Sequence, residues 1–351
     1  MDIAELLQLA IQQQASDIHV VVGVPPMLRI HGQLSMVANE PAAGAEKASE
    51  LVLGLMTPQQ KDILLTNREI DFSYSFAGQA RFRVNAYFEK GAMAAALRLI
   101  PSKIKTVDEL RLPRVCHSFT SLKQGFILVT GPTGSGKSST LAAMIEEINA
   151  NRAENILTIE DPIEFLYVPK KSIVSQREMH SDTHSWTVAL KSALREDPNV
   201  VLVGEMRDYE TIAAAITVAE TGHLVLATLH TNSAAQSIDR MIDVFPAHQQ
   251  AQVRQQLASS LEGILSQRLV PSLKGGRVPA IEVLLATPAV RNLIREGKSH
   301  QIDSVIQTSM ELGMMTLEMS LASWVKSGEV SIEVAQSYSL RPQELMRLVR
   351  G

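Results

Sequence analysis

The sequence has almost no cysteine, no long hydrophobic run and no excess of positive charge. Its single cysteine, Cys116, excludes an internal disulfide and a metal site built from clustered cysteines. No apolar run approaches the roughly 18 residues of a membrane-spanning helix, and the acidic start MDIAE lacks the basic region of a signal peptide. The net charge of −4 disfavours nucleic acid as a partner, because nucleic-acid binders usually carry a basic domain or stripe. We therefore expect a cytoplasmic protein with no nucleic-acid partner and no direct membrane insertion.

A complete phosphate-binding loop, GPTGSGKS, occupies residues 131–138. It follows the apolar run 126–130 and precedes a helical pattern, which is the strand–loop–helix context that the motif requires. Glycines let successive backbone N–H groups converge on a phosphate at a helix N-terminus. We expect Lys137 to contact the β- and γ-phosphates and Ser138 to offer its hydroxyl to Mg²⁺. The residues expected to bind the nucleotide in this loop are Thr133, Gly134, Ser135, Gly136, Lys137, Ser138 and Ser139.

The pattern of apolar residues changes near residue 100 and predicts two domains. Residues 1–100 combine a helical pattern at 3–11 with strand-like stretches at 17–22, 27–30, 71–76, 81–88 and 93–100. This pattern indicates a small α/β domain with a mainly antiparallel sheet. Residues 101–123 are polar and interrupted by two prolines, as expected of a linker that includes a short helix.

Residues 124–351 predict an α/β nucleotide-binding domain. Apolar strands at 126–130, 156–159, 200–203, 224–228 and 281–285 mostly alternate with helical segments, which favours a sheet buried on both faces. From about residue 246 we expect a largely helical region, with a long helix at 249–269 and a helix beginning at Pro288 after the N-cap Thr287. An apolar stripe at residues 317, 321, 324 and 325 is interpreted as core or subunit interface.

Carboxylates follow two of the predicted strands, at the edge where open α/β sheets bind ligands. In the segment EDPIE at 160–164, a turn at Pro162 would aim Glu164 at the γ-phosphate, where a carboxylate can orient or deprotonate the attacking water. The alternative is a solvated acidic turn. The strand at 200–203 leads to Glu205, but Gly204 stands where a usual Walker B motif has aspartate. Glu205 is therefore expected to act on magnesium through water, or on the attacking water itself.

Two histidines stand at the ends of one predicted strand, His223 before it and His230 after it. Residues seven apart on a strand do not meet at one point, which disfavours a joint metal site. One of them is a candidate sensor of the γ-phosphate, and the alternative for each is a structural histidine.

Together these motifs resemble the retraction ATPases of type IV pili, the PilT-like twitching-motility motors of the secretion-ATPase superfamily. The similarity covers nearly the whole chain. The matching segments are 15–19, 25–29, 81–85, the phosphate loop, the Asp box at 160–164, 204–208, the His box at 221–231 and AVRNLIRE at 289–296. Two positions depart from the pattern: Gln124 stands where many relatives have arginine, and Ser139 replaces a common threonine.

The resemblance implies a PAS-like N-terminal domain, a RecA-like ATPase domain and a homohexameric ring that binds ATP between subunits. It gives Lys137 and Ser138 as phosphate and magnesium ligands, Glu164 and Glu205 as catalytic acids, and His223 and His230 as the His box. Arg83 and Arg98 match arginines that reach the nucleotide of a neighbouring subunit; the alternative is ordinary ion pairs on strands. The implied partners are an inner-membrane pilus platform protein, which would hold the ring at the cytoplasmic face, and a paralogous retraction ATPase. Residues 101–114 would form the hinge between the domains.

The residues leave several functions open. Pilus-assembly and type II secretion ATPases share the same motifs, but they usually carry an added N-terminal region and a four-cysteine zinc module that this sequence does not show. An accessory retraction-motor paralogue is a further alternative within the class. A nucleotide-dependent scaffold or switch with little turnover belongs to a different class, as does a DNA-translocating motor, which the acidic balance disfavours.

Overall fold

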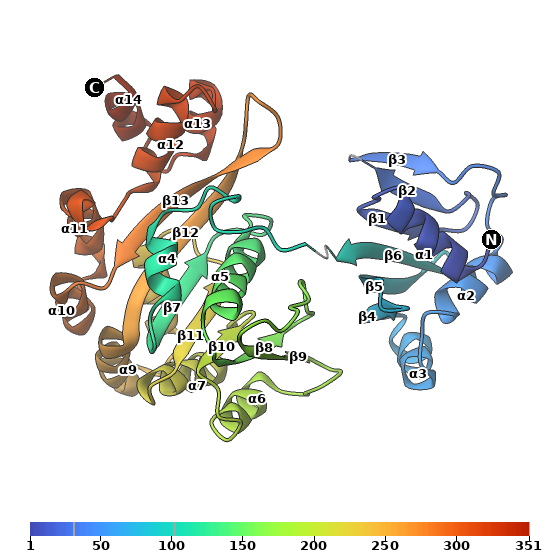
Figure 1. Cartoon of the computed structure of the whole chain (residues 1–351), viewed down its shortest axis with the longest axis horizontal. Helices are drawn as coiled ribbons and strands as arrows, with labels where there is room; N and C mark the ends of the chain where they lie inside the picture. The colour runs from blue at the N-terminus through green and yellow to red at the C-terminus, as the bar shows by residue number, and fades with distance from the viewer. Residues whose placement is uncertain (31, 101–102, 351) are drawn as a thin grey trace. The chain divides into compact units, whose positions relative to one another are not determined.

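The computed structural model describes residues 1–30, 32–100 and 103–350, and it divides the chain into two compact units (Figure 1). The N-terminal unit comprises Met1–Lys103 together with Pro162–Leu166, and the C-terminal unit comprises Ile104–Asp161 and Tyr167–Gly351. Residues 104–123, expected as linker, thus group with the C-terminal unit, while Pro101 and the residue after it lie outside the described residues. No helix among the described residues has both the length and the apolar character needed to cross a membrane.

The N-terminal unit is an antiparallel sheet in the order β3-β2-β1-β6-β5-β4, which confirms the predicted mixed α/β organisation. Helix α1 begins with a capping box in which Asp2 and Glu5 exchange side-chain and backbone hydrogen bonds, and it buries Leu6 and Leu7. The elements are α1 (Ile3–Gln12), β1 (Asp17–Val20), β2 (Met27–Ile30), β3 (Gln33–Met36), α2 (Ala45–Leu53), α3 (Pro58–Asn67), β4 (Glu69–Phe76), β5 (Ala80–Glu89) and β6 (Ala92–Ile100). Strand β3 and helices α2 and α3 were not predicted.

The C-terminal unit is built on one sheet in the order β13-β12-β7-β11-β10-β8-β9. Its strands run parallel from β12 to β9, and β13 pairs antiparallel with β12. The strands are β7 (Gly125–Thr130), β8 (Asn155–Glu160), β9 (Ile173–Glu178), β10 (Val200–Val203), β11 (Leu224–Leu229), β12 (Leu261–Pro271) and β13 (Arg277–Leu285). All residues of β7, β10 and β11 are buried, which explains why these strands are continuous apolar runs in the sequence.

The helices of this unit are α4 (Val115–Thr120), α5 (Lys137–Asn151), α6 (Trp186–Ala193), α7 (Tyr209–Glu220), α8 (Ala234–Asp243), α9 (Ala247–Ser260), α10 (Pro288–Glu296), α11 (Ile302–Thr308), α12 (Leu317–Lys326), α13 (Ile332–Tyr338) and α14 (Pro342–Arg350). Helices α10 to α14 gather at the side of the sheet formed by β13 (Figure 1). Thr287 caps α10 by accepting a hydrogen bond from the Val290 N–H, as predicted. Leu317 and Leu321 of α12 are buried in a core shared with β12 and β13, which confirms the core interpretation of the stripe.

The predicted helix at 249–269 is wrong in its second half. Helix α9 ends at Ser260, and the chain continues directly as β12 between β7 and β13. Apolar residues recur every four positions at 253, 257, 261 and 265, as on one face of a helix, so this spacing does not reveal that the second half is a strand. The region from residue 246 is therefore helical except for β12 and β13, which complete the central sheet.

Candidate nucleotide-binding site

The phosphate-binding loop connects β7 to α5, and two of its glycines, Gly131 and Gly136, lie in close contact with β12. Gly131 has φ +143° and Gly136, the N-cap of α5, has φ +90°. A Cβ atom on Gly131 would lie 2.2 Å from the carbonyl oxygen of Gln267, and one on Gly136 would lie 2.8 Å from the Gln267 side-chain nitrogen. Both positions therefore exclude larger residues through conformation and through contact with β12.

Lys137 opens α5 and directs its ammonium group back into the loop. Its Nζ donates hydrogen bonds to the carbonyl oxygens of Gly131 at 2.9 Å and Pro132 at 3.2 Å, and the residue is buried. The crest of the loop, Thr133 and Gly134, is exposed. The remaining predicted ligands range from buried to half-buried: Ser135, Gly136, Ser138 and Ser139.

Gln267 on β12 forms hydrogen bonds with the phosphate loop and with α5, and it was not among the predicted site residues. Its Nε2 donates to the Ser135 carbonyl at 2.7 Å, while its Oε1 accepts from the Thr140 hydroxyl at 2.8 Å. Ser135 lies in the loop and Thr140 lies on the first turn of α5. No local motif surrounds Gln267 in the sequence, so only the pairing of β12 with β7 reveals its position.

Glu205 follows β10 and lies in a cluster of positive charge. Arg207 binds it with two hydrogen bonds of 2.8 Å, and His230 Nε2 lies 3.2 Å from its Oε1. The hydrogen bonds from Arg207 lower the pKa of Glu205 against the opposing effect of burial, and the charges of His230 and Lys137 lower it further. The structure therefore brings Lys137, Glu205 and His230 together and holds Glu205 ionised.

Gly204 occupies a crowded position at the end of β10. Its carbonyl oxygen accepts a hydrogen bond of 2.5 Å from the Thr228 hydroxyl on β11. A Cβ atom at residue 204 would lie 3.2 Å from the Cα of Glu160 and 3.2 Å from the carbonyl oxygen of Ile159. A Walker B aspartate would therefore need this part of β8 to shift, so the glycine fits the close approach of β8 and β10.

The two histidines lie at opposite ends of strand β11. His223 precedes β11, and its Nδ1 lies 2.9 Å from the Val218 carbonyl oxygen and 3.0 Å from the Thr221 hydroxyl. His230 follows β11 and contacts Glu205. Six strand residues separate them, a length of roughly 20 Å. The contacts of His223 are those of a structural residue, whereas His230 belongs to the cluster around Glu205.

The predicted arginines face each other on adjacent strands of the N-terminal unit. Arg83 on β5 is the register partner of Arg98 on β6, and both are exposed. Arg98 Nε donates to Asp17 at 2.9 Å, and Arg29 Nε lies 3.6 Å from the same carboxylate. Burial opposes ionisation of Asp17, but hydrogen bonds from Arg98 and Ser16 hold its pKa below the usual value. The Asp17 carboxylate thus contacts Arg98 and Arg29, and these two arginines form with Arg83 a net positive stripe on one face of the sheet.

Glu164 is exposed and lies in the segment Pro162–Leu166 that groups with the N-terminal unit. Its role, like the roles of Arg83 and Arg98, stays a prediction. Glu160 begins the same box. It is buried at the end of β8 and accepts a hydrogen bond of 2.6 Å from the Thr158 hydroxyl.

Comparison with known families identifies the chain. The sequence model of the family described as "Type II/IV secretion system protein" matches residues 1–276, more than three quarters of the chain. The chain belongs to this family. The match spans both units and includes the phosphate loop, Glu205 and His230.

Individual members of the secretion-system family resemble the chain along its whole length. The protein described as "Type IV pilus retractation ATPase PilT" of Pseudomonas aeruginosa is 49% identical over 98% of this chain and 99% of its own length. "Type IV pilus ATPase PilU" of the same organism is 39% identical over 100% of this chain and 92% of its own. Among solved structures, the "Crystal Structure of the Pilus Retraction Motor PilT and Bound ADP" matches with a TM-score of 0.93 and 46% identity, covering 99% of both chains.

Proposed function

We propose that this secretion-system family protein is a motor that hydrolyses ATP and powers the retraction of type IV pili in twitching motility. One observation carries the proposal: a complete phosphate loop lies beside an ionised Glu205 in a chain that is 49% identical to a named pilus retraction ATPase. The buried hydroxyl of Ser135 also supports a ligand at the loop, because it has no hydrogen-bond partner among the described residues.

The residues of the site suit a nucleotide phosphate with its Mg²⁺. The backbone of residues 133–136 and the N-terminus of α5 would hold the phosphate oxygens, and Lys137 would exchange its carbonyl partners for the β- and γ-phosphates. The Ser138 hydroxyl and the Glu205 carboxylate are oxygen donors of the kind that Mg²⁺ takes. When bound, the cation would neutralise charge that develops on the phosphates.

Glu205 is the group best placed to activate the attacking water. A general base must be ionised at the working pH and within hydrogen-bond reach of the water. Arg207 and His230 meet the first condition, since both hold Glu205 charged. Arg207 also occupies both carboxylate oxygens, so hydrolysis requires that at least one of its hydrogen bonds be exchanged for the water. Glu164 is proposed to assist on the other side of the γ-phosphate.

A homohexameric ring would complete the site. We propose that the positive stripe containing Arg83 and Arg98 serves the nucleotide of a neighbouring subunit, because the single carboxylate of Asp17, which contacts Arg98 and Arg29, leaves a net positive charge on the three arginines. An arginine supplied in trans can contribute about 10³–10⁵ in rate, so an isolated subunit should hydrolyse ATP slowly. The ring would act at the cytoplasmic face of the inner membrane through a pilus platform protein, and a paralogous retraction ATPase is a candidate second partner.

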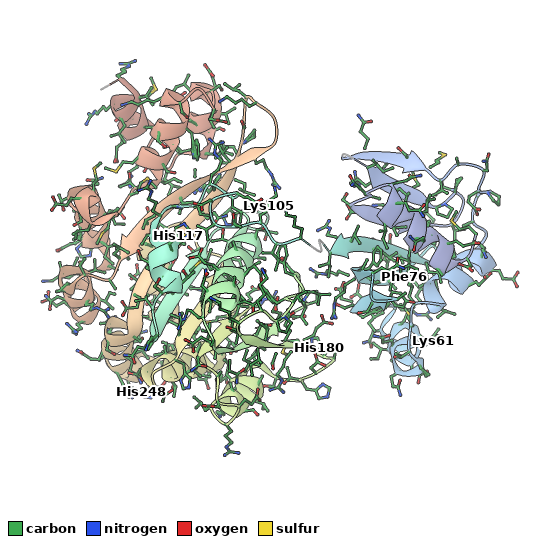
Figure 2. All side chains as sticks on the ribbon, in the orientation of Figure 1. Lys61, Phe76, Lys105, His117, His180 and His248 are labelled. Atoms are coloured by element: carbon green, nitrogen blue, oxygen red, sulfur yellow. The ribbon has the colours of Figure 1, made fainter. Side chains whose placement is uncertain are left out.

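We propose a hinge shorter than the predicted 101–114, because Ile104 and the residues after it group with the C-terminal unit. Arg111 stacks on the Trp324 ring at 4.4 Å and donates to Glu329 at 3.1 Å. His117 on α4, labelled in Figure 2, lies 2.9 Å from Glu147 of α5 and 3.4 Å from Asp108. We propose that residues 106–114 move with the ATPase unit when the domains rotate.

The proposal is tested by turnover and by motility. Purified wild-type protein should hydrolyse ATP, Lys137→Ala and Glu205→Ala should lose about 10²-fold or more, and the exposed Glu210→Ala on α7 should behave as wild type. Equal rates in wild type and both site variants would favour a nucleotide-binding scaffold.

A deletion strain should keep its surface pili and lose their retraction. Loss of the pili themselves would indicate an assembly motor, and retained retraction would indicate an accessory motor.

A further inference from the structure

Gln267 is a buried amide on the strand next to the phosphate loop. It is 2% exposed and lies on β12, one residue beyond the pair formed by Ser266 and Thr130 of β7. Its two side-chain hydrogen bonds end on parts of the chain that are more than 120 residues away in sequence. Gln267 therefore joins the phosphate loop and α5 to a strand that contributes no predicted ligand.

The primary amide suits both of its partners. The Ser135 carbonyl can only accept, so it needs the N–H of Gln267, and the Thr140 hydroxyl donates to the remaining oxygen. A glutamate would place its oxygen against the Ser135 carbonyl, and an apolar residue would leave both groups buried without a partner. The same side chain lies where a Cβ on Gly136 would fall, so its amide also fills the space beside the start of α5.

We propose that Gln267 is a positioning residue that fixes the phosphate-binding conformation of the loop. One hydrogen bond holds the loop at Ser135, and the other holds the first turn of α5 at Thr140, so the N–H groups between them converge before the nucleotide arrives. The inference rests on the proposed nucleotide binding. Without the amide, only a fraction of molecules would hold the binding conformation, and the apparent affinity would fall by that fraction.

Gln267→Met is the informative variant, because methionine has a similar length and volume but makes no comparable hydrogen bond. The dissociation constant for a fluorescent ADP and the KM for ATP should each rise about tenfold while kcat stays close to wild type, and the melting temperature should fall, because the Ser135 carbonyl and the Thr140 hydroxyl lose a buried partner. The matched control is Ser266→Ala, the next buried polar residue of β12, whose side chain points to the other face of the sheet. It should leave ADP affinity unchanged.

Thr140→Val provides a second test that removes one of the two hydrogen bonds at constant shape. ADP affinity should fall less than in Gln267→Met. The double variant should bind ADP only slightly more weakly than Gln267→Met, because the two side chains act on one contact. If Gln267→Met does not fold, unchanged affinity in Thr140→Val overturns the inference. Wild-type ADP affinity in a folded Gln267→Met also overturns it, as does a kcat loss with unchanged KM. If the wild type binds no better than Lys137→Ala, the proposed function itself fails.

Discussion

Replacing Glu282 by glutamine should stabilise the C-terminal unit at alkaline pH and have little effect at pH 5. Glu282 lies on β13, is 2% exposed, and accepts a hydrogen bond of 2.7 Å from the Ala234 N–H at the start of α8. The charged groups that act on it are Asp303, Glu318 and Arg341. Glutamine keeps the acceptor for Ala234 and removes the possibility of a buried negative charge.

The size and sign of the effect follow from the pKa of this carboxyl. Burial raises the pKa of Glu282 from 4.5 to about 7, the negative charges of Asp303 and Glu318 add to the rise, and the Ala234 hydrogen bond and Arg341 oppose it. Between pH 4.5 and 7 the native state binds more protons than the unfolded state, so the stability of the wild type falls as pH increases across this window. The full shift corresponds to about 3 kcal/mol above pH 7.

Urea unfolding at pH 5 and pH 8 measures this difference. Trp186 and Trp324 both belong to the C-terminal unit, so tryptophan fluorescence reports the unfolding of that unit alone. The free energy of unfolding of Glu282→Gln relative to wild type should be up to about 3 kcal/mol more favourable at pH 8 than at pH 5. The exposed Glu210→Gln serves as control and should show the same small difference at both values. A pH-independent difference for Glu282→Gln would refute the assignment of the charge cost to this residue.

Three further changes test contacts elsewhere in the C-terminal unit. Gly263→Ala would place a Cβ 2.2 Å from the Phe119 ring and should cost about 1–3 kcal/mol in thermal unfolding, with partial recovery in combination with Phe119→Leu. Gly136→Ala combines φ +90° with a contact of 2.8 Å, and titration with fluorescent ADP should show at least about tenfold weaker binding in a protein with a native circular-dichroism spectrum. The hydrogen bond from Arg111 holds the pKa of Glu329 at about 2, so its stabilisation is complete above pH 4.5 and lost as pH falls towards 2. Glu329→Gln should therefore reduce the dependence of the melting temperature on pH between 4.5 and 2, and an unchanged dependence would contradict this.

The sequence predicts the strands that are buried on both faces of the sheet. It does not predict a strand whose spacing resembles a helix or a strand that is exposed. The apolar runs of β7, β10 and β11 have no polar face, and each lies within a residue of its predicted bounds. Strand β12 is mostly buried but follows α9 without a turn, and its hydrophobic residues continue the helical spacing of Val253 and Leu257. The short strand β3 is exposed at all four residues, so no burial pattern marks it.

Local motifs mark the candidate site residues in the sequence, whereas nothing in the sequence marks the residues that support them. The residues of the phosphate loop stand together in sequence, and Glu205 and His230 each follow an apolar run whose end lies at the ligand-binding edge. Arg207 lies within the matched segment 204–208, but only the structure shows that it binds Glu205 through both oxygens. Gln267 depends on the register of β12 against β7, which no periodicity contains.

Strands β12 and β13 support the site from both faces of the sheet. Ser266 is the register partner of Glu282, and Gln267 is the partner of Ile281, so Gln267 and Glu282 point to opposite faces. Gln267 holds the phosphate loop on the α5 side. On the other face, Glu282 accepts a hydrogen bond from the Ala234 N–H at the start of α8. Ala234 lies four residues after His230. The two loops that would contact the nucleotide are thus each fixed by one side chain of adjacent strands that carry no nucleotide motif. Replacing Gln267 should therefore change nucleotide affinity without touching a ligand, while replacing Glu205 should change the rate.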